Sequence, residues 1–303
     1  MSYSDGSFEF DGKVLVDEVS EMMNIHIEDS DSDTIGGYIF GLLGRTPIVG
    51  DTVDAYGYTF EVIKMQGYRI SRLRSGAFNT PAIVVSRKKY KLYSVFTFIT
   101  PSLGIIRASF PHKRLQTLRN ASYLRPFSAM YITVVQDGEF VKVTQIDGSY
   151  VVESLDTNLD NIAYAAVASE LIQELFASYD VDRNVFNTVV NYSKSIRQRN
   201  VRLGTIILGW QMLSLAGVMP QHEAFTTGDG IDLFWNELRI HTHMNPSLSL
   251  RNAMPTILAY QWGDAAPIEL PGTVWKELER LLFSYCEQEI GKQLQSVKFL
   301  MSL

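Results

Sequence analysis

The sequence predicts a multidomain α+β protein, in which a small mixed domain precedes a strand-rich segment and a helical region. At 303 residues the chain is longer than a typical single domain. Its hydrophobic pattern is mixed at first and strand-like between 82 and 146. It takes helical three-and-four spacing from Leu159 onward. The net charge changes sign along the same divisions.

The charge is strongly segregated along the chain. Residues 1–75 carry 6 Lys/Arg and 13 Asp/Glu, a net charge of −7, whereas residues 76–150 carry 10 and 3, a net charge of +7. Residues 151–303 carry 11 and 17, a net charge of −6. We therefore expect three domains with these bounds, and Ser75-Gly76 marks the first boundary. Such asymmetry indicates a polyanion site in the middle segment. The alternative is a solvated basic face without a partner.

The composition is that of an ordinary globular protein, with 46% hydrophobic and 20% charged residues. The one cysteine, Cys286, excludes an internal disulfide and a four-cysteine zinc site. The sequence contains neither the roughly 18 consecutive apolar residues of a membrane helix nor a secretory signal pattern. We expect a cytoplasmic protein without a membrane part.

The first segment predicts a compact α+β domain. Phe8–Leu15 alternates around Asp11-Gly12, which favours a hairpin turn. A helix over 32–43 is expected, with Asp33 as N-cap and Gly44 just past its end. The remaining expected elements are a helix over 16–23 and strands over 52–56, 58–65 and 68–74.

The middle segment predicts five short strands, rich in β-branched and aromatic residues. Asp137-Gly138 is a typical two-residue hairpin turn between the last two strands. Five strands in about 70 residues suggest a five-stranded barrel, and the OB-fold is the nucleic-acid-binding barrel of that size. The expected strands cover 82–85, 91–100, 104–110, 131–136 and 140–146.

Helical spacing dominates the third segment, which predicts an α-helical domain. The stretch 220–255 is less regular and resembles an insert with short elements. The expected helices cover 162–178, 184–197, 203–215 and 273–295.

The middle segment contains nine basic residues between 87 and 125 and no acidic one. Such cations can neutralise phosphates and release counterions. Tyr90 and Tyr93 flank them and are candidates for base stacking, whereas alternation places Phe96 and Phe98 on one strand face, where a core role is the stronger expectation. The phosphate-binding candidates are Arg87, Lys88, Lys89, Lys91, Arg107, Lys113, Arg114, Arg119 and Arg125.

Metal and catalytic sites are not indicated. His222, His241 and His243 could bind a metal together with nearby carboxylates, but their spacing matches no specific motif, and a polar loop is the stronger interpretation. Cys286 lies in an apolar helical pattern, so a buried thiol is expected. No base or orienting partner accompanies it, and we predict a protein that is not an enzyme and has no cofactor.

The first 74 residues resemble the CorC/HlyC transporter-associated domain, a family whose module follows paired CBS domains and whose fold is related to a flavin-binding subdomain. No catalytic residue comes with this resemblance. It is carried by Asp5-Gly6-Ser7-Phe8, Asp11-Gly12, Gly36-Gly37, Leu43-Gly44-Arg45, Thr46-Pro47, Val49-Gly50-Asp51, Phe60-Glu61-Val62 and Arg69-Ile70.

Residues 78–303 resemble RecO, a bacterial recombination mediator with an OB-fold followed by a helical domain. The order of several short motifs carries this resemblance. They are Ala82-Ile83-Val84-Val85, Arg87-Lys88-Lys89-Tyr90, Phe96-Thr97-Phe98, Gly104-Ile105-Ile106, Leu124-Arg125-Pro126-Phe127, Asn161-Ile162-Ala163-Tyr164-Ala165, Glu170-Leu171 and the stretch 213–220.

The RecO resemblance implies a nucleoid-associated protein of DNA repair and recombination, which binds single-stranded DNA, anneals strands and assists RecA loading. The implied partners are single-stranded DNA, RecR and the C-terminal tail of single-stranded-DNA-binding protein, with double-stranded DNA left open. In the family an apolar helical surface such as 278–283 receives that tail, although helix stripes usually form core.

The sequence departs from the RecO pattern at two places. The four-cysteine zinc site of many members is missing, and a Lys-Gly-Ala-Arg-like stretch is replaced by Phe110-Pro111-His112-Lys113-Arg114. The first 74 residues leave a second hypothesis open, a regulatory module of an ion-efflux protein. Under the first hypothesis, the acidic N-terminal segment could shield the basic middle.

Overall fold

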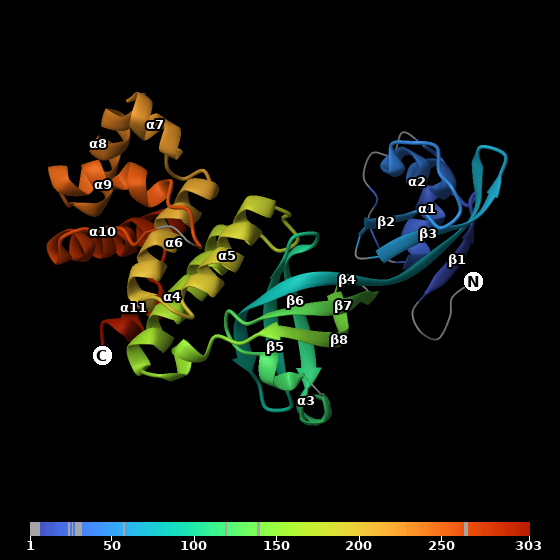
Figure 1. Ribbon diagram of the computed structural model, residues 1–303, viewed down its shortest axis with the longest axis horizontal. Helices are drawn as coiled ribbons and strands as arrows, with labels where there is room; N and C mark the ends of the chain where they lie inside the picture. Colours follow the sequence, from blue (N-terminus) through green and yellow to red (C-terminus); the bar gives the residue numbers. More distant parts are fainter. Residues whose placement is uncertain are drawn as a thin grey trace.

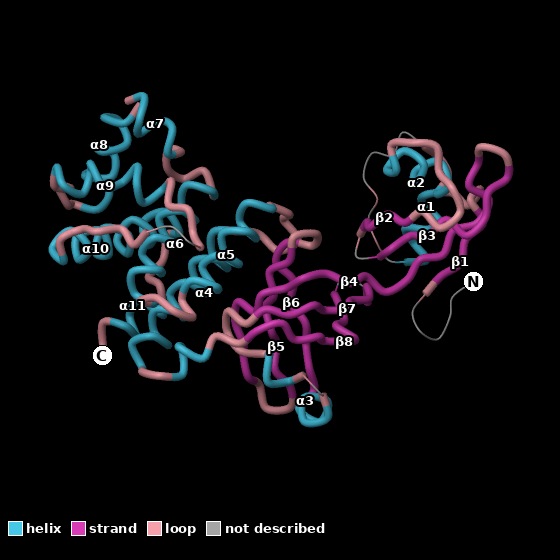
Figure 2. Tube along the Cα trace, viewed as in Figure 1, coloured by secondary structure: helices cyan, strands magenta, loops and turns pink. Residues whose placement is uncertain are grey.

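The computed structural model describes residues 7–23, 25, 27, 32–56, 58–118, 120–137, 140–228, 230–263 and 266–303. Figure 1 shows three consecutive parts along the long axis, and Figure 2 shows a strand-rich part between a mixed part and a helical part. The chain is therefore a multidomain α+β protein, as the sequence predicts. Among the described residues, no helix is both long enough and apolar enough to span a bilayer.

The N-terminal part packs two helices on an antiparallel sheet. Its core contains Val19, Ile35, Ile39, Phe60 and Leu73, all of which are almost fully buried. The elements are β1 (Phe8–Asp11), α1 (Val16–Met23), α2 (Ile35–Leu43), β2 (Thr52–Ala55), β3 (Tyr58–Gln66) and the first half of β4 (Arg69–Lys89).

Two local predictions for this domain are wrong. Phe8–Leu15 is not a hairpin: β1 pairs instead with β4, and the Gly12 N–H donates to the Ser71 carbonyl at 3.0 Å. A Cβ on Gly12 would lie 2.0 Å from the Ile70 carbonyl oxygen, so Gly12 permits this close strand contact. The N-cap of α2 is Thr34 rather than Asp33, since the Thr34 side chain accepts from the Gly37 N–H; Gly44 ends the helix as predicted.

Strand β4 is 21 residues long and belongs to both sheets. Its first half pairs with β1 and β3, and its second half pairs with β7 and β5. The boundary predicted at Ser75-Gly76 therefore falls inside a continuous strand. The two parts have separate cores on either side of that point.

The middle part contains the five predicted strands in the antiparallel order β8-β7-β4-β5-β6. Phe96 and Phe98 are buried in its core, as expected. Asp137 pairs with Phe140 at the ends of β7 and β8, and the predicted Asp137-Gly138 turn includes Gly138, which lies outside the described residues. The elements are the second half of β4, β5 (Tyr93–Thr100), β6 (Gly104–Pro111), α3 (His112–Thr117), η1 (Ala121–Tyr123), β7 (Ala129–Asp137) and β8 (Phe140–Tyr150).

The predicted closed barrel is not observed. β6 and β8 are in contact, but no ladder joins them in the described part of the chain. Side chains from the β6–β7 connection bind the edge of β8 instead. The Arg114 Nη2 donates to the carbonyls of Val143 at 2.6 Å and Thr144 at 3.1 Å, and Asn120 Nδ2 donates to Ile146 at 2.7 Å. These bonds satisfy carbonyls that an edge strand would otherwise expose.

The third part is helical, and the predicted long helices are all present with shifted ends. The 220–255 stretch contains three helices that belong to the same core as the long ones, so it is an integral layer rather than an insert. The elements are η2 (Glu153–Asp156), α4 (Leu159–Leu175), α5 (Arg183–Ser195), α6 (Val201–Leu215), α7 (His222–Thr227), α8 (Ile231–Thr242), α9 (Leu248–Leu258), α10 (Gly272–Ile290) and α11 (Gln295–Leu300).

Helix α4 joins the helical part to the middle sheet. The Ser169 hydroxyl donates to the Val85 carbonyl at 2.6 Å, and Gln173 Oε1 accepts from the hydroxyls of Ser86 and Thr97 at 3.1 and 3.2 Å. A shared apolar cluster runs from the sheet into α4, α5 and α6. Hydrogen bonds and burial together fix the helices against the sheet.

A partly buried polar cluster joins three helices. Glu279 on α10 accepts from Arg202 Nη2 at 2.6 Å and Nε at 2.9 Å, and from the Tyr164 hydroxyl at 2.6 Å. Desolvation and the bond to Glu279 raise the pKa of Tyr164. The bond to Glu279 also raises the pKa of Arg202. The carboxylate is thus paired on both sides.

Replacing Glu279 with Ala should lower the free energy of unfolding by about 2 kcal/mol, because it leaves Arg202 half-buried and unpaired. Tyr164→Phe removes one hydrogen bond and should cost about 1 kcal/mol. Urea unfolding followed by far-UV circular dichroism measures both. A Glu279→Ala variant no less stable than Tyr164→Phe would contradict the role of this cluster.

Candidate nucleic-acid interface

The β4–β5 hairpin gathers the densest group of predicted phosphate-binding residues. Arg87, Lys88 and Lys89 end β4, Lys91 lies in the turn, and all four side chains are exposed. The turn is closed by the Tyr90 N–H, which donates to the Tyr93 carbonyl at 2.8 Å. The strand ladder thus brings these four cations together at one end of the middle part.

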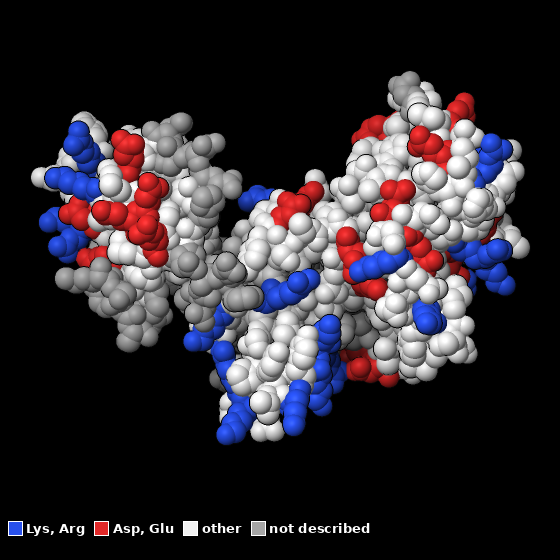
Figure 3. All heavy atoms as spheres, turned by 180° about the vertical axis from the view of Figure 1, so that it is seen from behind, with Lys and Arg blue, Asp and Glu red and all other residues white. Residues whose placement is uncertain are grey.

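Helix α3 lies beside this hairpin. The His112 N–H donates to the Leu92 carbonyl at 3.1 Å, and Tyr93 pairs with Pro111 in the β5–β6 ladder. Lys113 is exposed and adds a fifth cation at the same end. In Figure 3 the lower end of the middle part shows Lys and Arg atoms without Asp or Glu atoms among them.

The other predicted cations are not gathered there. Arg114 binds the edge of β8 and lies over the Phe110 ring at 5.4 Å, so its guanidinium has a structural role. Arg125 forms an ion pair with Asp156. Arg107 projects from the outer face of β6. Arg119 lies outside the described residues.

A hollow of about 520 Å³ lies between the middle sheet and α4. Arg87 and Arg107 line its sheet side, and Glu170 and Glu174 line its helix side. Both carboxylates are engaged elsewhere: Glu170 accepts from the backbone N–H groups of 295 and 296, and Glu174 pairs with Lys292 at 2.7 Å. The mixed charge makes this hollow a poorer phosphate site than the hairpin end.

The two tyrosines predicted for stacking lie against each other at the hairpin. Their ring centroids are 4.8 Å apart with an interplanar angle of 19°, and Tyr90 and Tyr93 are 40% and 39% exposed. The Lys88 ammonium lies 6.0 Å from the Tyr90 ring. Of the other aromatics between 87 and 125, Phe96, Phe98 and Phe110 form core, and Tyr123 packs against Gly148.

Three residues of this end, Ser94, His112 and Leu92, were missed by sequence reasoning. Ser94 is buried, and its hydroxyl lies 3.4 Å from His112 Nε2 and 3.3 Å from Arg87 Nη2. The Arg87 guanidinium also lies 5.3 Å from the Phe96 ring. Leu92 is 74% exposed at the turn. Leu92 was missed because the expected strand over 91–100 included it, whereas β5 begins at Tyr93.

The metal and thiol predictions concern the helical part. The His222 Nδ1 lies 3.1 Å from Glu223. Within the described ranges, no three His, Cys, Asp or Glu side chains come together as a metal cluster. This includes His222, His241 and His243. Cys286 is completely buried, as expected, and burial raises the pKa of its thiol.

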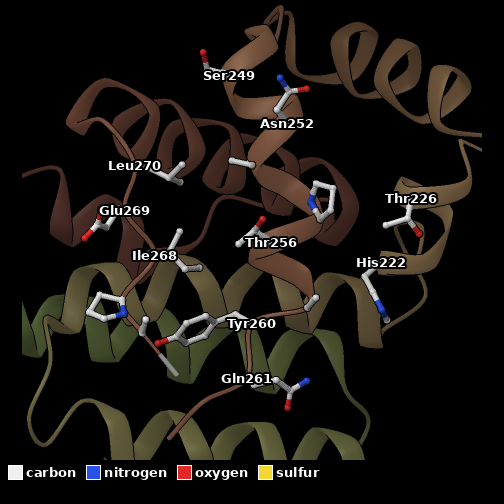
Figure 4. Close-up of a pocket in the computed structure, with 15 residues that line it drawn as sticks. His222, Thr226, Ser249, Asn252, Thr256, Tyr260, Gln261, Ile268, Glu269 and Leu270 are labelled. Carbon is white, nitrogen blue, oxygen red and sulfur yellow. The ribbon is translucent and has the colours of Figure 1, made fainter. Parts of the chain in front are cut away.

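The apolar run at 278–283 is core, because Leu278, Leu281, Leu282 and Phe283 are at most 4% exposed. It is therefore not a free docking surface. A broad hollow of about 830 Å³ lies instead along α9. Figure 4 shows α9 between His222 on one side and Ile268 on the other.

A smaller pocket of about 250 Å³ is lined by Leu203, Ile207 and Trp275, with Arg199 at its border. The Arg199 Nη2 donates to the Gly263 carbonyl at 2.8 Å, and its Nη1 donates to the Tyr260 hydroxyl. An apolar floor beside a guanidinium suits a small apolar group that carries a carboxylate.

Comparison with known proteins identifies the N-terminal domain. Residues 2–75 match the CorC_HlyC family model, "Transporter associated domain". This segment is a transporter-associated domain. The sequence prediction for residues 1–74 is confirmed.

The matched relatives align with this chain over the N-terminal domain. Hemolysin C of Brachyspira hyodysenteriae is 30% identical over 74 residues, which are 24% of this chain and 28% of the relative. The magnesium and cobalt efflux protein CorC of Escherichia coli K12 is 34% identical over 55 residues, 18% of this chain and 19% of the relative. The chain thus spans less than a third of the length of these relatives.

A crystal structure of a CorC_HlyC domain from Haemophilus ducreyi is 31% identical, with a TM-score of 0.23. The match covers 25% of this chain and 93% of that domain.

The Cys286 thiol should not react with an aromatic disulfide reagent at pH 8 in the folded protein, because burial both shields it and disfavours its thiolate. Absorbance of the released thiolate measures the reaction. The same chain unfolded in guanidinium should release one equivalent rapidly. Rapid release from the folded chain would show that the α10 core opens readily.

Proposed function

We propose that this chain is a non-enzymatic DNA repair and recombination protein, similar to RecO, that binds single-stranded DNA through the β4–β5 hairpin end. The exposed cations Lys88, Lys89, Lys91 and Lys113, next to the Tyr90–Tyr93 pair, are the observation that carries the proposal. Cations supply affinity for any phosphate backbone, and tyrosine rings offer stacking faces to unpaired bases. The proposed setting is cytoplasmic, in association with the nucleoid.

The middle sheet supports this proposal through its connectivity. Strands β4, β5 and β6 form a meander, and β7 then returns to the other side of β4. This order resembles the partly open Greek-key arrangement of an OB-fold, which commonly binds single strands. We propose that the middle part is a variant of that fold whose β8 edge is bound by Arg114 and Asn120.

Protein partners are proposed for the helical part. The pocket beside Arg199 is the best candidate for the C-terminal tail of a single-stranded-DNA-binding protein, since it combines apolar walls with a cation. RecR is the second proposed partner, and RecA loading and strand annealing are the proposed outcomes. None of these roles requires a bond to be made or broken.

The pair of changes Lys88→Glu and Lys89→Glu should weaken binding to single-stranded DNA by at least about tenfold. It should also reduce the slope of log affinity against log salt by about 1.4, since each phosphate contact contributes about 0.7. If about five phosphates are neutralised, the unaltered chain should show a slope near −3.5. Fluorescence anisotropy with labelled oligonucleotide measures both quantities.

A matched control is Lys276→Glu with Lys298→Glu, which makes the same charge change at exposed positions of α10 and α11. Its affinity should stay within about twofold of the unaltered chain, apart from a small long-range effect. Equal losses in the two variants would mean that net charge, not the hairpin end, determines binding. Arg114 is left unchanged because of its bonds to β8.

The acidic N-terminal domain should not shield the hairpin end. The strand from Ser75 to Lys88 is about 40 Å long, several times the Debye length of about 8 Å at physiological salt. Replacing the exposed Asp17, Glu18 and Glu21 with Asn or Gln should therefore change the DNA affinity by less than about twofold. A gain of tenfold in the same anisotropy assay would instead establish autoinhibition.

A second candidate function is regulation of ion efflux, favoured by the transporter-associated domain at residues 2–75. Relatives that share this domain are named as efflux proteins. Titration of the chain with adenosine and flavin nucleotides, followed by tryptophan and flavin fluorescence, tests it. Saturable nucleotide binding without any DNA binding would favour this candidate over the first.

A further inference from the structure

The tip of the β4–β5 hairpin has a composition that phosphate binding alone does not require. Leu92 is 74% exposed at the turn, and the half-exposed Tyr90 and Tyr93 rings stack beside it. Lys89 and Lys91 flank it in sequence. A large apolar side chain is thus held at the outermost point of a cationic loop.

This tip is preformed. The Leu92 carbonyl accepts from the His112 N–H at 3.1 Å, which ties the turn to the start of α3. The stacked rings of Tyr90 and Tyr93, whose centroids are 4.8 Å apart, also stabilise the turn. The backbone hydrogen bond between Tyr90 and Tyr93 closes it. The backbone at Leu92 is therefore held in place with the side chain exposed, and little backbone entropy is lost when it binds.

The surroundings of Leu92 select the kind of ligand. Cations on both sides favour an anionic partner, and the exposed Leu92 side chain would gain most from a partner with an apolar face close to its negative charge. The end of a DNA duplex meets both conditions, because its last base pair presents a flat apolar face between two phosphate backbones. Apolar side chains such as Leu are known to insert at base steps in this way.

An anionic membrane surface is the other partner with such chemistry, but the tip fits it less well. Stable attachment of a protein to a bilayer needs a large apolar area or two separate anchors. The hairpin offers one exposed leucine, since the tyrosine rings bury much of their surface against each other.

We propose that the hairpin recognises the junction between single-stranded and double-stranded DNA, with Leu92 placed against the terminal base pair. Lys88, Lys89 and Lys91 contact the phosphates around the junction, and the single strand continues along the basic end. This inference rests on the proposed single-strand binding and adds the substrate class. Leu92 acts as a wedge at the fork, and no covalent step is involved.

The experiment compares the full chain with its Leu92→Ala variant on two labelled probes, a single strand and a partial duplex with a single-stranded tail of the same length. A 2-aminopurine in the terminal base pair reports unstacking. The unaltered chain should prefer the junction by about tenfold, the effect of one added stacking contact. It should also raise the 2-aminopurine fluorescence.

Leu92→Ala should lose the junction preference and the fluorescence rise, while single-strand affinity stays within about twofold. Leu248→Ala is the matched control, because Leu248 is 73% exposed on α9 in the helical part. It should behave as the unaltered chain. Leu92→Ala with an unchanged junction preference, or an unaltered chain without one, would overturn the inference.

Two further outcomes distinguish the junction role from single-strand binding itself. If neither probe binds the unaltered chain, the single-strand function fails and the junction role fails with it. If single strands bind equally with and without a junction, only the junction role fails. Vesicles of phosphatidylserine and phosphatidylcholine complete the test: binding that depends on Leu92, without a junction preference, would assign the tip to a membrane surface.

Discussion

The architecture depends on one strand that serves two sheets. β4 pairs with β1 and β3 in its first half and with β5 and β7 in its second, so nearly every residue along it is laddered to at least one neighbouring strand. A flexible linker would let the acidic domain sample many positions, whereas a laddered strand does not. The acidic domain and the hairpin are thus joined at opposite ends of one stiff element.

The cations of the middle part fall into two groups, those with a structural role and those available to a ligand. Arg114 is bound to the edge of β8, and Arg125 is paired with Asp156. For Lys88, Lys89, Lys91 and Lys113, by contrast, no ion pair is found within the described part of the chain. Their concentration at one hairpin is most simply explained by an external anion.

Much of the fold could be predicted because periodicity is a local signal. The helix over 16–23 and the strands over 58–65 and 104–110 were placed almost correctly, since burial of one face determines their patterns. The wrong predictions concern which strands pair with each other. Asp11-Gly12 carries a good hairpin signal, but the β1 edge is paired with β4, more than 60 residues away. Such long-range pairing is not encoded in the turn itself.

The sequence composition predicts the candidate site at the β4–β5 hairpin, and the structure shows which of its cations are available. The run Arg87-Lys88-Lys89 predicts an exposed, cation-rich end of the middle part, because consecutive cations at the end of a strand have no core to enter. Sequence could not separate Arg114 from its neighbour Lys113, since only the open edge of β8 gives Arg114 acceptors. Leu92 was missed because the expected strand over 91–100 included it, whereas β5 begins at Tyr93 and the turn exposes Leu92.

Helix α4 connects the hairpin rigidly to the helical domain. Gln173 accepts from Ser86 on β4 and Thr97 on β5, the two strands that lead to the hairpin, while Tyr164 on the same helix joins α6 and α10 through Glu279. A protein tail bound beside Arg199 on the loop before α6 would therefore be held at a fixed distance from DNA bound at the hairpin. Under the proposed function, such fixed spacing would favour simultaneous binding of protein and single strand, because the geometry of the connection sets the effective concentration of the second binding event.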